Sequence, residues 1–179
     1  LERSGMPKTR HSLVERMIGA MSLNIDVFEE VEHDEDATGQ AATVVLMVAI
    51  ASGIGSSGFG LYGTAVSSVG ALIDWVVWAG ICYVVGDQLF GGRATWGELL
   101  RTLGFAQAPG VFLLLVLIPI LHDPIIVIVL LWSAVAGFIA VRQGLDIGNL
   151  KTLFTIILAT GVIGFIEWIQ QVRILSDLP

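Results

Sequence analysis

The sequence is poor in the residues on which soluble enzymes and nucleic-acid-binding proteins depend. Charged residues make up 14% of the 179 positions, where soluble domains average about 25%. The single cysteine, Cys82, excludes a disulfide framework and any C-x-x-C site. Acidic residues outnumber basic ones and give a formal net charge of −7, which argues against nucleic-acid binding because that usually requires a basic patch.

The combinations of side chains that form active sites are also missing. No nucleophile, base and orienting group occur together, and no phosphate-binding loop is present. Residues 53–58 spell G-x-G-x-x-G, with Asp74 about 20 residues further on, but a dinucleotide fingerprint requires a preceding strand, and this run lies inside an apolar segment. We therefore interpret these glycines as helix-packing positions and expect no enzyme activity, no cofactor and no metal.

Apolar residues are what the sequence has in abundance, at 55% of the chain. They form five runs that are roughly long enough to cross the ~30 Å hydrocarbon layer of a bilayer as helices. The sequence therefore predicts an all-α polytopic membrane protein, with a domain of five transmembrane helices over residues 40–172. The expected spans are residues 40–59, 63–90, 104 or 109 to 121, 125–141 and 152–172, with a tight turn at residues 122–124 and a polar loop at 142–151.

The segment before the first span has a different character. Residues 1–11 are polar and are expected to form a flexible tail, and residues 12–39 to form a cytoplasmic amphipathic helix and an acidic turn. Apolar residues recur every three or four positions over residues 12–32, which indicates a helix that breaks near residues 22–26. It could lie at the membrane interface, but the acidic polar face of its second half favours packing on protein over binding anionic lipid.

The distribution of basic residues predicts the orientation in the membrane. Lys and Arg are enriched on the cytoplasmic side of membrane proteins. With the amino end inside, eight of the nine basic residues fall in cytoplasmic segments, and only Arg173, in the expected external tail 173–179, lies outside. We therefore expect a multi-pass protein of the prokaryotic plasma membrane, that is, the cell (inner) membrane. Its N-terminus should lie in the cytoplasm and its C-terminus outside. The eight are Arg3, Lys8, Arg10, Arg16, Arg93, Arg101, Arg142 and Lys151.

Residues 91–110, GGRATWGELLRTLGFAQAPG, join the second and third expected spans. Thr95 and Glu98 have the Thr-x-x-Glu spacing of a helix capping box. Leucines and Phe105 supply an apolar side, and Pro109 marks a point where a new helix can begin. The segment thus predicts a short amphipathic helix over residues 91–105 that covers the cytoplasmic side of the bundle.

The same stretch resembles the signature of the Yip1 domain family, in its prokaryotic branch of small multispan membrane proteins. Residues 28–40 (FEEVEHDEDATGQ) and residues 131–150 (LWSAVAGFIAVRQGLDIGNL) resemble the family as well, and the resemblance covers roughly residues 13–172. It implies a non-enzymatic role. Eukaryotic members act in membrane trafficking and bind small prenylated GTPases, but this chain lacks the Asp-Leu-Tyr-Gly-Pro element expected of those members before the first span, which weighs against a GTPase partner.

These observations lead to a first hypothesis, a membrane scaffold or accessory subunit whose partners are membrane lipid and other integral membrane proteins. The carboxylate run at residues 29–36 lacks the ligand spacing and glycine of a calcium loop, so we interpret it as a solvated cytoplasmic face or a docking surface for a basic partner. The residues expected to contact a partner or to pack closely are Glu29, Glu30, Glu32, Asp34, Asp36, Gly53, Ser56, Gly60, Arg93, Trp96 and Arg101.

Asp74 supports an alternative hypothesis, a small-solute, ion or proton transporter or channel. A carboxylate at the middle of a transmembrane helix costs about 2.5–3.5 kcal/mol on insertion scales. We therefore expect Asp74 to face the interior of the bundle, either hydrogen-bonded to a neighbouring span or as part of a proton or ion path. No internal repeat of the kind that builds transporters is apparent in the sequence.

Overall fold

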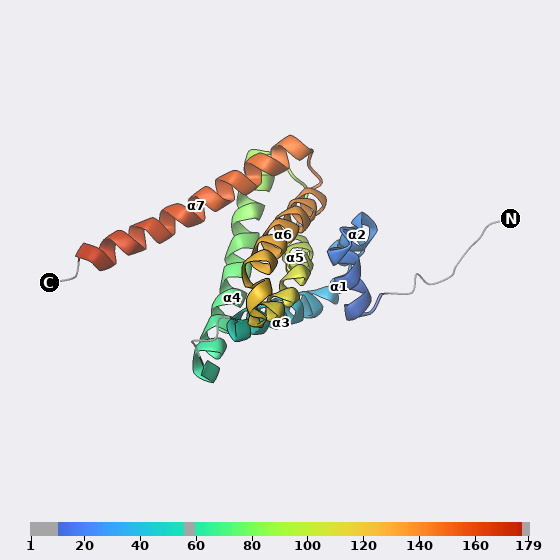
Figure 1. Cartoon of the computed structure of the whole chain (residues 1–179). Helices are drawn as coiled ribbons and strands as arrows, with labels where there is room; N and C mark the ends of the chain where they lie inside the picture. Colours follow the sequence, from blue (N-terminus) through green and yellow to red (C-terminus); the bar gives the residue numbers. More distant parts are fainter. Residues whose placement is uncertain (1–10, 56–59, 177–179) are drawn as a thin grey trace.

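The computed structural model describes residues 11–55 and 60–176, and within them the chain is all-helical (Figure 1). Ser56, one of the expected packing residues, lies outside the described residues. The elements in order are α1 (Leu13–Met21), α2 (Ile25–His33), α3 (Ala37–Gly55), α4 (Gly60–Tyr83), the π-helical turn η1 (Val84–Leu89), α5 (Trp96–Ala106), the 3₁₀ segments η2 (Ala108–Leu117) and η3 (Pro119–Leu121), α6 (His122–Leu145) and α7 (Asn149–Ser176).

Four helical segments among the described residues are long and apolar enough to cross a membrane. They are Ala37–Ile54, Gly63–Leu89, Trp96–Leu117 and Pro119–Leu145. The apolar part of α7, Asn149–Phe165, is shorter, so the expected number of five spans is not confirmed. In its described residues the chain is thus all-helical, with four candidate membrane spans.

The third span differs most from the expectation. This candidate span begins at Trp96, because the 3₁₀ segment η2, with Pro109 in its first turn, follows α5 after the single residue Gln107. Proline is compatible with this junction because the first turn of a helix needs no backbone N–H. The capping box is present: the Thr95 hydroxyl accepts from the Glu98 N–H, and the Glu98 carboxylate accepts from the Thr95 N–H. The predicted capping box is thus confirmed, whereas the predicted position of the helix, as a cover on the bundle, is not.

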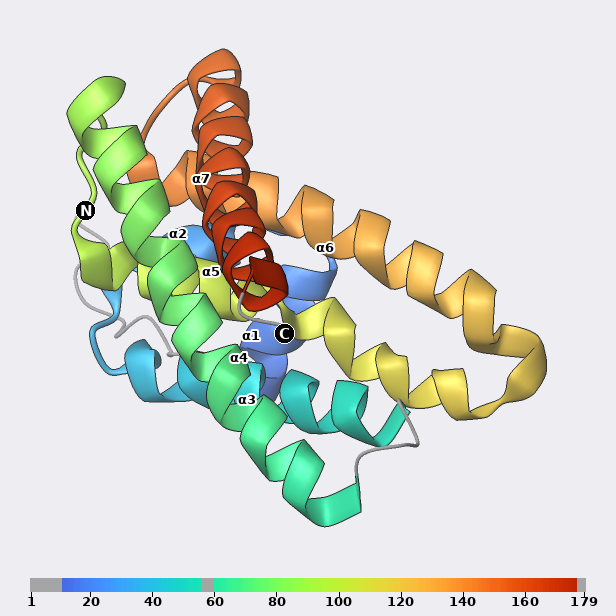
Figure 2. The ribbon, with the colours of Figure 1, turned by 90° about the vertical axis from the view of Figure 1, so that its left-hand side faces the viewer.

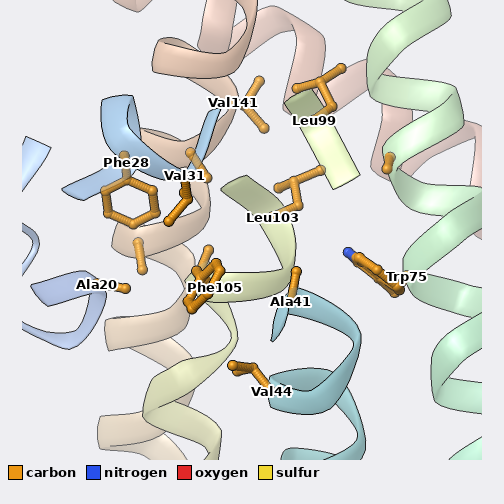
Figure 3. Packing of buried hydrophobic residues seen from close by; sticks show 14 of the residues in the cluster. Ala20, Phe28, Val31, Ala41, Val44, Trp75, Leu99, Leu103, Phe105 and Val141 are labelled. Carbon is orange, nitrogen blue, oxygen red and sulfur yellow. The ribbon is translucent and has the colours of Figure 1, made fainter. Parts of the chain in front are cut away.

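α5 lies in the interior of the molecule, whereas the sequence indicated a covering helix. It packs against α2, α3, α4 and α6, and in Figure 2 α4 crosses in front of α3 and α5. Gly104 and Gly110 permit this close packing, because a Cβ on Gly104 would lie 2.7 Å from the Cβ of Ala41, and one on Gly110 would lie 2.4 Å from a Val48 methyl group. Figure 3 shows the resulting core, to which six helices contribute Ala20, Phe28, Val31, Ala41, Val44, Trp75, Leu99, Leu103, Phe105 and Val141.

The N-terminal segment breaks where the sequence indicated. α1 ends at Met21, Leu23 adopts a left-handed backbone with φ 58°, and α2 starts at Ile25. The cap of α2 is Asn24, whose side chain accepts from the Asp26 N–H at 3.0 Å. The chain then turns at residues 34–36, and α3 already begins at Ala37.

The remaining turns also fall at other residues than expected. Residues 122–124 form the first turn of α6, and the chain reverses at residues 118–121. Pro124 fits there because a helix does not use the N–H groups of its first turn. α6 runs on to Leu145, where Asp146 closes it with φ 55°, so that the loop before α7 is shorter than residues 142–151.

α7 leaves the bundle. Its first turns pack against α6, η1 and α4 through buried Thr152, Thr155 and Ala159, and the Lys151 ammonium donates to the Phe90 carbonyl at 2.9 Å. Beyond them Val162, Phe165 and Trp168 are exposed. Figure 1 shows this C-terminal part projecting away from the other helices. The helix reaches Ser176, so part of the expected tail 173–179 is helical, and residues 177–179 lie outside the described residues.

Candidate partner-binding surfaces

Two carboxylates of the acidic run at residues 29–36 form ion pairs with another residue of the same chain. The Arg16 side chain, 1% exposed, donates from Nη2 to Glu30 at 2.8 Å and to Asp34 at 2.6 Å, and Nη1 donates to the Gln40 amide oxygen at 2.9 Å. Burial disfavours the ionised form of Glu30, but hydrogen bonds from His11 and Arg16 outweigh it and hold the Glu30 pKa below its ordinary value. Glu30 and Asp34 therefore fasten α1 to α2.

The Arg101 side chain also forms its contacts within the chain. It is 6% exposed, and its Nε donates to the carbonyl oxygens of Val31 at 2.9 Å and Glu32 at 3.1 Å. These carbonyls belong to the C-terminal end of α2, where a helix carries partial negative charge and lacks intrahelical donors. Arg101 thus ties α5 to α2, and the structure places it in an internal contact where the sequence suggested a partner surface.

Glu32 is the titratable group with the most unusual setting outside the candidate spans. Its side chain is half-buried, and burial raises its pKa to about 7, with smaller contributions from the carboxylates of Glu98, Asp146 and Glu29. His33 acts in the opposite direction. A pKa near 7 leaves Glu32 protonated in a large fraction of molecules at neutral pH.

The other expected contact residues lie nearer to solvent. Glu29 is exposed and accepts from the Gln143 side chain at 3.2 Å. Asp36, in the turn between α2 and α3, is also exposed. Arg93 is exposed, with its backbone N–H bound to the Leu145 carbonyl at 3.1 Å. Trp96 is 47% exposed at the start of α5. The structure therefore separates the expected surface into internal clasps and a smaller exposed set.

Gly53 of the first candidate span packs within the bundle. A Cβ on Gly53 would lie 2.9 Å from the Thr64 methyl group, so α3 approaches α4 closely at this point. Gly60 is described as the first residue of α4. By contrast, Gly70 on α4 and Gly161 and Gly164 on α7 would have no neighbour within 4 Å of an added Cβ.

Asp74 faces away from the bundle, in contrast to the expectation. Trp75 sets the rotation of α4: its side chain is 6% exposed, and its indole N–H donates to the Leu100 carbonyl at 3.0 Å. Ser68, Ala79 and Cys82 lie on the same inward face. Successive residues of an α-helix differ by about 100°, so Asp74 is turned outward, where it is exposed and has no hydrogen-bond or ion-pair partner in residues 11–55 and 60–176.

Sequence reasoning missed two contacts that hold the N-terminal helices. Arg16 was counted only among the cytoplasmic basic residues, and its buried ion pairs with Glu30 and Asp34 were not expected. Trp132 of α6 donates its indole N–H to the Met21 carbonyl at 2.7 Å, and no sequence signal marks that backbone acceptor.

Within the described part of the chain, no group of three or more His, Cys, Asp or Glu side chains could hold a metal ion.

Comparison with protein families matches the Yip1 domain to residues 21–169, which is most of the chain. No curated protein and no solved structure matches the sequence.

Proposed function

Because the chain belongs to the Yip1 domain family, we propose that it is a non-enzymatic scaffold or accessory subunit of a membrane protein complex. Its membrane would be the prokaryotic cell membrane, with the N-terminus in the cytoplasm, as the distribution of basic residues favours. Its partner would be another integral membrane protein. The projecting part of α7 is the observation that carries this proposal.

The glycines explain why α7 supports a protein partner over lipid alone. Inside the bundle, Gly53, Gly104 and Gly110 each mark a place where a neighbouring helix approaches closely. In membranes, van der Waals packing at such close approaches helps to drive helix association, because lipid tails are as apolar as the helix surface. Gly161 and Gly164 offer the same bare backbone on α7, with no neighbour from the chain itself, and apolar Val162 and Phe165 lie exposed beside them.

Photo-crosslinking in native membranes tests the proposal. A photo-reactive amino acid at Val162 should form an adduct with a second, distinct membrane protein. The same amino acid at Ile120, which is 83% exposed on the turn before α6, is the control and should not capture that protein. The proposal is wrong if the two positions give the same products or if Val162 yields no protein adduct.

The transporter alternative has no observation in its favour. An intramembrane carboxylate that relays ions or protons faces the bundle interior or a water-filled cavity. Asp74 is turned to the outer surface of α4 by the inward-facing Trp75. Its position suits contact with another molecule better than a path through this one.

A further inference from the structure

Asp74 occupies the middle of a candidate membrane span. The span covers Gly63–Leu89, so Asp74 lies roughly 16 Å along the helix axis from one end and roughly 22 Å from the other, at about 1.5 Å per residue. Long Lys and Arg side chains can reach the interface from inside the membrane, but an aspartate side chain is too short to do so from this depth. Carboxyl groups at such depth are costly and usually pair with another polar group in the membrane.

Among the residues that the structure describes, no basic side chain is available at that depth. Arg16 and Arg101 are held in the internal contacts with α2, and Lys151 donates to the Phe90 carbonyl. Arg93 and Arg142 lie at the ends of candidate spans, and the other four basic residues, Arg3, Lys8, Arg10 and Arg173, lie near the two termini of the sequence. The described part of a second copy therefore has no cation to place against Asp74.

The surroundings of Asp74 on the outer face of α4 are those of a helix-docking surface. Gly70 lies one turn before it, with open space where a Cβ would be, and a glycine at such a site lets a second backbone come close. Apolar side chains flank this position on the exposed face: Val66, Val69, Ile73 and Val77.

We propose that the outer face of α4 binds a transmembrane helix of a different protein, which places a Lys or Arg side chain against Asp74. The apolar side chains supply the packing area, Gly70 sets the close approach, and the ion pair sets the depth and choice of partner. This inference rests on the proposed function for the existence of a membrane partner, and it adds the surface and the charge by which that partner is recognised.

Model helices in vesicles test the charge directly. The full chain, labelled with a donor dye, is reconstituted in phosphatidylcholine vesicles with acceptor-labelled leucine-rich transmembrane peptides that carry one lysine at mid-helix, one lysine near an end, or none. Energy transfer should show that the wild-type chain binds the central-lysine peptide about tenfold more tightly than the other two, the range of measured polar contacts between membrane helices. Asp74→Asn should reduce this preference, and Asp74→Leu should abolish it.

Asp123→Asn is the matched control, because Asp123 is an exposed carboxylate at the start of α6 and its loss should leave the preference unchanged. Thermal unfolding of each variant reports whether the fold is kept, and outward-facing Asp74 should tolerate both changes. Equal binding of all three peptides by the wild-type chain overturns the inference, as does a preference that survives in Asp74→Leu. Energy transfer between two labelled copies that depends on Asp74 overturns it in favour of a homodimer. If the vesicle assay shows no lysine preference while Val162 still forms adducts in native membranes, only the charge pairing is refuted. If the Val162 adducts are absent, the proposed function is refuted.

Discussion

The half-buried Glu32 provides the sharpest test of how α2 is held against α5. Burial raises its pKa from 4.5 to about 7, so the folded state binds the proton more tightly than the unfolded chain does. The free energy of unfolding is then highest below about pH 4.5 and falls as the pH rises toward and through 7. Replacing Glu32 with glutamine removes the charge and keeps the shape of the side chain.

The magnitude follows from the pKa shift. Raising the pKa from 4.5 to about 7 corresponds to about 3 kcal/mol. Solvent reaches part of the side chain and screens it, so we expect Glu32→Gln to stabilise the protein by about 1.5 kcal/mol at pH 8. For a chain of this length that amounts to a rise in Tm of about 4 °C.

Thermal unfolding of the detergent-solubilised protein at pH 5 and pH 8 measures this effect. The difference in Tm between Glu32→Gln and the wild-type chain should be about 4 °C at pH 8 and should shrink as the pH approaches 5. Glu35→Gln, in the same acidic run but exposed, is the control for the loss of a carboxylate and should leave the Tm at pH 8 close to that of wild type. Equal Tm values for Glu32→Gln and wild type at pH 8 would refute the assignment of Glu32 as a destabilising buried acid.

Two further predictions concern packing and the N-terminal clasp. Gly104→Ala should destabilise the protein by about 1–3 kcal/mol through overpacking, because its Cβ would lie 2.7 Å from that of Ala41. The control Gly161→Ala, whose Cβ would have nothing within 4 Å, should leave the Tm equal or higher. Equal losses of stability in both variants would contradict the central position of α5. Arg16→Leu removes the buried guanidinium that joins α1 to Glu30 and Asp34, at a cost of about 3 kcal/mol. Hydrogen exchange over residues 12–36 should accelerate while the core of α5 stays protected, and unchanged exchange would show that these ion pairs do not hold α1 in place.

Features that depend on residues close together in sequence were predicted better than features that depend on tertiary packing. The Thr95 and Glu98 capping box and the break between α1 and α2 depend on residues a few positions apart, and both are present. The apolar runs located four candidate spans, although their ends shifted. The burial of α5 was not predictable from composition, because Arg101 is satisfied by backbone carbonyls of α2 some seventy residues away in sequence, and backbone acceptors leave no trace in a residue pattern.

The candidate surfaces show the same division. The sequence correctly marked Asp74 as a polar group within an apolar run, but it could not give its direction. That direction depends on Trp75, whose indole N–H finds the Leu100 carbonyl on another helix. Nor could apolar periodicity reveal that α7 leaves the bundle after Ala159, because an apolar helix has the same pattern whether lipid, its own bundle or a partner covers it.

The mass of the particle extracted with its native lipids tests the proposed role most directly. The chain alone has a mass of 19.1 kDa. Native mass spectrometry of particles extracted without detergent exchange should show this chain together with at least one different membrane polypeptide. Particles that contain only one or several copies of the 19.1 kDa chain would contradict an accessory or scaffold function.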